Sequence, residues 1–120
     1  MAVDMHIKKD RFEDVGPRDA HGKRLFYYAG LIYEFIGEEE KFVARRYDHS
    51  WSEASFLSPQ IKRGDEWHAM LFDPIPYDSP IFSAAVQYLL DTEGVQKVLI
   101  LSGGKDVGYE VIEPEKLNHN

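Results

Sequence analysis

Hydrophobic positions along the chain gather in short runs whose composition predicts a sheet. Residues 25–36 and 41–49 are rich in aromatic and β-branched side chains, which favour strands. The first run is apolar on both faces, as expected for a central strand, and Gly30 inside it is typical of a bulge or bend. Gly37, which tolerates a left-handed backbone, and three glutamates separate the runs, so we predict a β-hairpin over residues 25–49.

Residues 25–36 also leave a helical alternative open. Leu25, Tyr28, Ile32 and Ile36 fall near helical spacing. The density of aromatic and β-branched side chains favours the strand over the helix.

Three later segments also carry strand patterns. Residues 65–72 alternate between two faces, residues 95–101 form the apolar run of a buried strand, and residues 107–112 form the last strand. We expect residues 50–64 to be irregular and residues 3–7 to form at most a short edge strand.

The clearest helix signal begins at Ser79, whose hydroxyl can accept a hydrogen bond from an early amide as the N-cap. Pro80 suits the first helical position, and Gly94 suits the left-handed residue that follows a helix. One apolar stripe with helical spacing runs between them and consists of Phe82, Ala85, Val86, Leu89 and Leu90.

These elements predict an α+β fold with the order β-β-β-α-β-β. The economical architecture is an antiparallel sheet of about five strands with the helix packed on one face. Residues 1–120 suit a single domain, in which we expect residues 1–23 and 113–120 to be partly flexible. The other face of the sheet must then be covered by loops, by another copy of the chain or by a ligand.

Composition narrows the class of protein. The 120 residues include 43% hydrophobic side chains and sixteen aromatic ones, which suits a globular sheet protein. A net charge of −7 disfavours nucleic-acid binding, because phosphate backbones select for Lys and Arg. The lack of cysteine excludes disulfides, thiolate catalysis and Cys-ligated zinc. No apolar run approaches the ~20 residues that span a bilayer and no secretory signal is present, so we expect a cytoplasmic protein without membrane contact.

Residues 101–106, with the sequence LSGGKD, follow a hydrophobic strand. They resemble the phosphate-binding loop of the PP-loop ATP pyrophosphatases, whose signature is SGGxDS. The resemblance implies a loop and helix N-terminus that bind pyrophosphate, with Ser102, Gly103 and Gly104 as ligand-binding residues. Here Val107 replaces the second serine and a strand pattern follows, so we predict a glycine hairpin turn.

A second group of candidate residues lies along the second strand and consists of Arg45, Arg46, Asp48 and His49, with Tyr47 among them. Histidine titrates near neutrality, and a carboxylate neighbour supplies a partner for general acid–base catalysis. Alternation sends Arg45, Tyr47 and His49 to one face and Arg46 and Asp48 to the other. A solvated outer strand with charges of both signs is the alternative interpretation.

His68 is the third candidate, next to Trp67 on a predicted strand. If His49 and His68 lie on neighbouring strands and share a face, they could form one catalytic or ligand-binding site. No two histidines have the spacing of a zinc motif, so we predict no metal and no cofactor.

The strands carry more aromatic side chains than one helix can cover. Among them, the candidate ligand-binding residues are Trp67, Tyr47 and Trp51. Our leading hypothesis is therefore a non-enzymatic protein-interaction module with an aromatic, acid-rimmed sheet face, most simply a homodimer. An immunity-type inhibitor of a basic toxin or nuclease is one specific version. The competing hypothesis is a small-molecule binder or enzyme that uses the two histidines with Arg45 and Asp48 in an aromatic-lined cleft.

Overall fold

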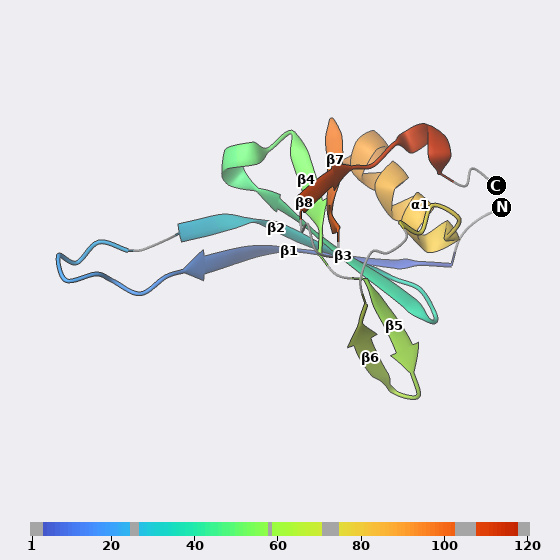
Figure 1. Ribbon diagram of the computed structural model, residues 1–120, viewed down its shortest axis with the longest axis horizontal. Coiled ribbons are helices and arrows are strands. Elements are labelled where there is room, and N and C mark those ends of the chain that lie inside the picture. The colour runs from blue at the N-terminus through green and yellow to red at the C-terminus, as the bar shows by residue number, and fades with distance from the viewer. Residues whose placement is uncertain (1–3, 25–26, 58, 71–74, 103–107, 118–120) are drawn as a thin grey trace.

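In the computed structural model, which describes residues 4–24, 27–57, 59–70, 75–102 and 108–117, eight strands form one twisted sheet with a helix across one face (Figure 1). The strands are β1 (His6–Val15), β2 (Tyr27–Ile36), β3 (Glu40–Tyr47), β4 (Glu53–Phe56), β5 (Gln60–Arg63), β6 (Glu66–Ala69), β7 (Lys97–Ser102) and β8 (Gly108–Val111). The helix α1 (Pro80–Gln87) continues into the π-helical turn η2 (Tyr88–Thr92), and two 3-10 turns are η1 (Asp48–Ser50) and η3 (Pro114–Lys116). The chain is therefore α+β, as the hydrophobic pattern predicts.

The strand order explains how so many short strands join one sheet. Six strands follow the order β1-β2-β3-β4-β7-β8, and neighbours are antiparallel except β4 and β7, which run parallel. One edge of β3 is shared, because β4 pairs with Ala44 and Arg45 whereas β5 pairs with Glu40 and Lys41. The β5–β6 hairpin thus leaves the main sheet and projects away from the helix (Figure 1).

The core lies between α1 and the sheet face that carries Tyr33, Phe35, Phe42 and Phe56. The ring of Phe82, on α1, lies with its centroid 5.3 Å from that of Phe42 and 5.2 Å from that of Phe56. All five side chains are buried. The aromatic surplus of the strands is thus partly used in packing the helix onto the sheet.

Both ends of the helical segment form as predicted. The hydroxyl of Ser79 accepts a hydrogen bond from the Phe82 amide at 3.3 Å, and Pro80 is the first residue of α1. Gly94 follows η2 with a positive φ of 70°. The predicted apolar stripe faces the sheet, and its last member, Leu90, is half-buried.

The hairpin predicted over residues 25–49 is present as β2 and β3, and the described part excludes the helical alternative. Gly30 makes no bulge, because the pairing register continues through it; a Cβ there would collide with the carbonyl of Arg46. Gly37 does not have a positive φ, and a Cβ there would lie 2.8 Å from Cδ1 of Ile81 on α1. Both glycines therefore permit close packing rather than an unusual backbone conformation.

Other segments correct the sequence prediction. Residues 3–7 are expected to form at most a short strand, yet β1 runs for ten residues along the edge of the sheet. Residues 50–64 contain β4 and β5, so the prediction of about five strands is wrong. The described part of the C-terminal segment contains η3 and the buried side chain of Leu117, and the predicted partial flexibility of residues 113–120 stays a prediction. The strands predicted over residues 65–72, 95–101 and 107–112 overlap β6, β7 and β8.

The β1–β2 hairpin extends beyond the rest of the sheet as an arm (Figure 1). β3 pairs with β2 only from Gly30 to Ile36, so in the described structure residues 27–29 pair with residues 13–15 alone. The Cα radius of gyration is 15.6 Å, against about 14 Å for a compact chain of this length. We call residues 13–24 and 27–29 the arm.

Candidate functional site

The face of the sheet opposite α1 carries apolar side chains in two groups, one on β1 to β3 and one on β7 and β8, with Arg45 and Ser55 between them. Residues that lie opposite each other on neighbouring strands share a face, and this identifies these side chains. They include Phe12, Tyr28, Ile32, Tyr47, Leu99, Tyr109 and Val111. Tyr28 is 44%, Val111 48% and Tyr109 67% exposed to solvent. We call this surface the helix-free face.

Four rings contact one another on this face at the base of the arm. The ring centroid of Tyr47 lies 5.6 Å from those of Phe12 and His49 and 5.9 Å from that of Tyr28. The guanidinium of Arg45 covers Phe12, with Cζ 4.6 Å from the ring centroid. This ring cluster joins β1, β2, β3 and η1, and it brings the predicted residues Arg45, Tyr47 and His49 together.

The carboxylates of Asp14 and Asp48, which flank the ring cluster, are held by arginines. Asp48 accepts two hydrogen bonds from Arg11, at 3.0 and 2.8 Å, and these bonds lower the pKa of Asp48 below its ordinary value. Asp14 accepts a hydrogen bond from Nη1 of Arg45 at 2.9 Å. The predicted group of Arg45, Asp48 and His49 is therefore organised by ring packing and ion pairs, with the carboxylates already engaged.

The structure keeps the two candidate histidines apart. His49 follows the C-terminal end of β3, whereas His68 on β6 lies opposite Ile61, which lies opposite Glu40 at the start of β3. Seven residue steps along a strand correspond to about 23 Å. The two histidines therefore do not share a site. Among the described residues, no group of three or more His, Asp or Glu side chains could hold a metal ion.

The two tryptophans that we predict as ligand-binding residues both contact cations of the chain itself. Nζ atoms of Lys41 and Lys62 lie 5.1 and 5.9 Å from the ring centroid of Trp67. Cζ of Arg46 lies 4.0 Å from the ring centroid of Trp51, and Nε of Arg46 donates to the Trp51 carbonyl at 2.6 Å. These contacts are cation–π interactions that hold the rings in place.

A polar network that the sequence does not indicate lies on the helix side of the sheet. The carboxylate of Glu93, after η2, accepts a hydrogen bond from the Tyr33 hydroxyl at 2.7 Å and pairs with Nζ of Lys9 at 2.8 Å. The carbonyl of Glu93 accepts a hydrogen bond from Nη1 of Arg46, a buried side chain, at 3.1 Å. We call Lys9, Tyr33, Arg46 and Glu93 the Glu93 network. It joins the end of the helical segment to three strands.

Burial and hydrogen bonds in this network shift the pKa values of Glu93 and Tyr33. Burial raises the pKa of Glu93, but the hydrogen bonds from Lys9 and Tyr33 outweigh burial, and the pKa lies below its ordinary value. Burial and the bond to Glu93 raise the pKa of Tyr33 to about 12. Both groups therefore keep one charge state at neutral pH, which suits a structural role.

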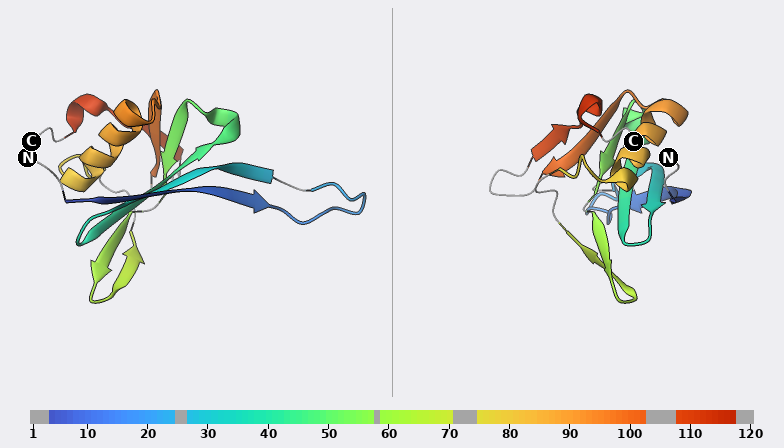
Figure 2. Two further views of the ribbon diagram at one scale, coloured as in Figure 1. Left: turned by 180° about the vertical axis from the view of Figure 1, so that it is seen from behind. Right: turned by 90° about the vertical axis from the view of Figure 1, so that its right-hand side faces the viewer.

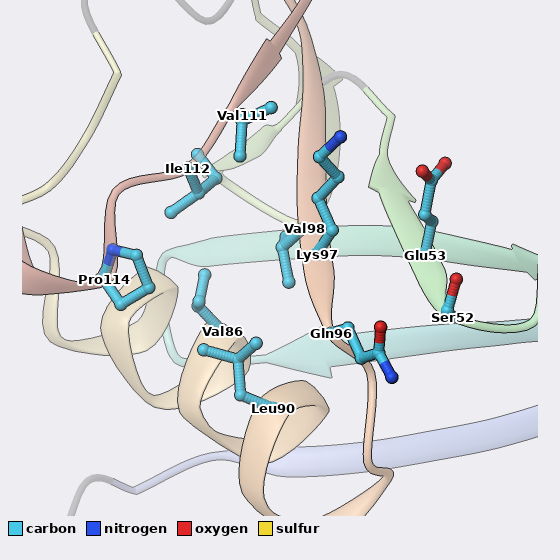
Figure 3. A pocket seen from close by; sticks show the side chains of 10 residues that line it. All are labelled: Ser52, Glu53, Val86, Leu90, Gln96, Lys97, Val98, Val111, Ile112 and Pro114. Carbon is cyan, nitrogen blue, oxygen red and sulfur yellow. The ribbon is translucent and has the colours of Figure 1, made fainter.

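A cavity of about 470 Å³ lies where the helix meets the β7–β8 end of the sheet, and Val111 of the helix-free face is among the residues that line it. Figure 3 shows Val86, Leu90 and Ile112 on one side of it and Glu53 and Lys97 on the other. The two charged residues lie opposite each other in the β4–β7 register, so the polar side carries both signs. A cavity with this lining suits a small ligand with an apolar body.

The segment that resembles a phosphate-binding loop is described only in part. Ser102 ends β7, and Gly103 and Gly104 lie outside the described residues. β8 then pairs with β7, with Ser102 opposite Gly108. A strand therefore follows the segment, as a hairpin requires, where the pyrophosphatase loop leads into a helix.

Comparison with known proteins gives no match to a family model, to a curated protein or to a solved structure. In the part of the chain that the structure describes, no helix is long and apolar enough to cross a membrane.

Proposed function

We propose that this chain is a non-enzymatic protein-interaction module, and that its simplest form is a homodimer. The observation that carries the proposal is the helix-free face, on which Tyr28, Tyr109 and Val111 are exposed. Exposed apolar side chains on one face of a sheet are candidate sites of protein interaction. Tyrosine is favoured in such sites because its ring is apolar and its hydroxyl is polar.

The polar groups beside this face favour binding over catalysis. A general base must be able to accept a proton from a substrate. Asp14 and Asp48 already accept hydrogen bonds from Arg45 and Arg11, and the ring of His49 packs against Tyr47. These contacts shape a fixed surface, which is what recognition of a protein partner requires.

The net charge of −7 favours a basic protein as the alternative partner, since opposite charges speed encounter. An immunity-type inhibitor of a basic toxin or nuclease would be such a case.

Light scattering after size exclusion tests the homodimer directly. We expect twice the mass of one chain at micromolar concentration and a return to the mass of one chain on dilution. The mass of a single chain at every concentration would refute self-association.

The cavity between α1 and β8 favours a second candidate, binding of a small molecule. A ligand bound there should raise the melting temperature of the wild type but not that of Leu90→Trp, whose larger side chain fills the cavity. A ligand screen in which no compound discriminates between these proteins would count against the candidate.

A further inference from the structure

β1 is the outermost strand of the sheet, and its open edge is long. Within the described residues β1 pairs only with β2, along all ten residues from His6 to Val15. Figure 2 shows β1 running along one side of the molecule, from near the N-terminus to the arm. An edge of this length offers a row of N–H and C=O groups with which another strand can pair.

Charges along β1 are unevenly distributed by sign. Its first half carries Lys8 and Lys9 against Asp10, and its second half carries Glu13 and Asp14 against Arg11. Antiparallel pairing of two identical strands would bring the positive half of each against the negative half of the other. Charged residues on an edge commonly oppose pairing, but this arrangement makes the edge complementary to itself.

We propose that two copies of the chain form a two-fold dimer by antiparallel pairing of β1 with β1, in the register that places Arg11 opposite Arg11. The proposal rests on the self-association proposed above but places it at the edge of β1, so the helix-free face stays available to a further partner. Lys8 then lies opposite Asp14 of the second copy, and Lys9 lies opposite Glu13. Symmetry makes each of these pairs twice, so four pairs of opposite charge cross the interface.

The same register matches the end residues of the strand, while Asp10 lies opposite Phe12 without a complementary charge. Ile7 lies opposite Val15, which is 40% exposed in the single chain and would be covered. Arg11 lies opposite Arg11 of the second copy. In each copy its charge is compensated by Asp48 of the same chain, with Nη2 of Arg11 2.8 Å from Oδ2 of Asp48. Apolar side chains therefore flank the charged pairs at both ends of the ladder.

Neighbouring registers are unfavourable. Cross-strand partners must share a face, and side chains of β1 alternate between its two faces. The allowed registers are therefore those in which one residue lies opposite its own copy. Pairing centred on Asp10 would place Asp10 opposite itself and Lys9 opposite Arg11. Pairing centred on Phe12 would place Asp10 opposite Asp14, a repulsion that offsets the attraction between Arg11 and Glu13. Like charges directly opposite each other destabilise a sheet, so the register centred on Arg11 is preferred.

The side chains that the proposal needs are accessible. Lys8 makes no ion pair with any described residue, and it is exposed. Asp14 and Lys9 have partners in their own chain, but their side chains remain 45% and 43% exposed. Each can therefore take part in a second ion pair across the interface.

The tip of the arm carries a charge that differs from the rest of the chain. Residues 16–24 contain Arg18, Lys23 and Arg24 against the single carboxylate of Asp19, a net charge of +2 that leaves −9 for the remainder of the chain. The Asp19 carboxylate accepts hydrogen bonds from two backbone amides of the turn, at 2.8 and 2.9 Å. The tip is thus an ordered basic projection on an acidic protein.

The proposed register places this tip beside an acidic region of the second copy. The arm of each copy would extend past His6 of the other, where Asp4 and Glu38 line a hollow of about 370 Å³. Continuing the register three residues beyond Val15 brings Arg18 level with Asp4. Opposite charges therefore meet at both ends of the dimer as well as along the strands.

Backbone pairing from residue 7 to residue 15 would add about ten hydrogen bonds, the number typical of a whole protein interface. A two-fold axis perpendicular to the sheet keeps both helices on one side. The two helix-free faces would then join into a single surface, open to a further partner.

Charge exchange tests the pairing by light scattering or sedimentation at physiological salt. Lys8→Asp places two carboxylates opposite each other, and Asp14→Lys places two ammonium groups opposite each other. Each variant alone should dimerise on the order of 30-fold more weakly, since two pairs change from attraction to repulsion. An equimolar mixture should recover a one-to-one dimer, because both repulsions become attractions. Lys62→Asp, on an exposed strand outside the interface, should dimerise as the wild type does.

Failure of the β1 interface can be distinguished from failure of self-association. A wild type that stays a single chain refutes self-association and this interface together. A wild-type dimer that both variants preserve keeps self-association and overturns the β1 interface. Weakened variants that do not recover on mixing overturn the register. Recovery on mixing also shows that each variant is folded.

A cysteine cross-link gives a second measurement that does not depend on charge. The chain has no cysteine, so Arg11→Cys carries a single thiol. In the proposed register the two thiols lie on directly opposed residues, about 4.5–5.5 Å apart at Cα, within reach of a disulfide. Mild oxidation should cross-link Arg11→Cys rapidly and Lys62→Cys slowly. Equal rates for the two variants would overturn the proposal.

Discussion

The hydrogen bond between Tyr33 and Glu93 can be tested as an energetic coupling. Tyr33 is fully buried, and its hydroxyl donates at 2.7 Å to a carboxylate that also pairs with Lys9. We consider Tyr33→Phe, Glu93→Ala and the double variant. The two residues are sixty positions apart in sequence, so any coupling must come from the folded structure.

Leaving a buried hydrogen-bonding group without a partner costs more than removing the group, and this sets the expected loss of stability in each variant. Tyr33→Phe removes the donor but leaves Glu93 paired with Lys9, and should cost about 1.5 kcal/mol. Glu93→Ala leaves the Tyr33 hydroxyl buried without its acceptor and loses the ion pair, and should cost about 3 kcal/mol. The double variant leaves no buried hydroxyl without an acceptor. It should therefore cost about 3 kcal/mol instead of the sum of the two single costs. The expected coupling is about 1.5 kcal/mol.

Urea unfolding followed by tryptophan fluorescence and circular dichroism measures all four proteins. Equal slopes against urea would show that the unfolding reaction is the same in each. Tyr27→Phe is the matched control, because Tyr27 also donates to a glutamate, Glu13 at 3.1 Å, but is exposed. It should leave the urea midpoint unchanged. Additivity of the Tyr33 and Glu93 effects within about 0.3 kcal/mol would refute the buried bond.

The helix packing, the helix cap, the close approach at Gly30 and the titration of Glu93 can each be tested. Phe82→Ala should lower the free energy of unfolding by about 3–5 kcal/mol, and a thermal melt without loss would show that α1 is not packed on the sheet as described. Ser79→Ala should cost about 1 kcal/mol through loss of the N-cap, measured by urea unfolding. Gly30→Ala should cost about 1–3 kcal/mol, because its Cβ collides with the Arg46 carbonyl; an unchanged melting temperature would contradict this contact. The pKa of Glu93 is depressed in the folded state, so its contribution is complete above its ordinary pKa of 4.5 and is lost as pH falls through the folded pKa. Glu93→Gln should lack this part of the acid dependence in a titration of stability against pH.

Local patterns predicted the elements whose signals lie close together in the chain. The helical segment is specified by Ser79, Pro80 and Gly94 at its ends and by an apolar stripe between them, and all of these signals act within one or two turns. The β2–β3 hairpin has the same local character, because two apolar runs are separated by a short polar turn.

The strands that the sequence pattern does not predict are polar or short. β1 contains seven charged or histidine side chains in ten residues, because one of its edges is open and one of its faces is mostly solvated. β4 and β5 have four residues each, too few for alternation to be recognised. Their pairing depends on β3, which offers one edge to both. Such strands are fixed by tertiary contacts rather than by local pattern.

In the candidate site too, the sequence predicts what depends on one strand and does not predict contacts between distant segments. Alternation correctly separated Arg45 and Tyr47 from Arg46 by face, since that depends only on β3. The partners of these side chains come from distant segments, as Asp14 does for Arg45 and Glu93 does for Arg46. The alternation of side chains along one strand does not identify partners from distant segments.

β1 connects the interior of the protein with the proposed interface. Lys9 lies near the middle of the strand and pairs with Glu93 at 2.8 Å, which fastens the strand to the end of the helical segment. Arg11 adds a second connection through Asp48, and Ile7 packs against the core. A strand held in this way loses little conformational freedom when its other edge is paired. Side chains that point toward the helix thus fix β1 in place, while its backbone edge stays open. The same polar sequence that hides β1 from pattern analysis therefore provides both its attachment to the fold and its complementarity to a second copy.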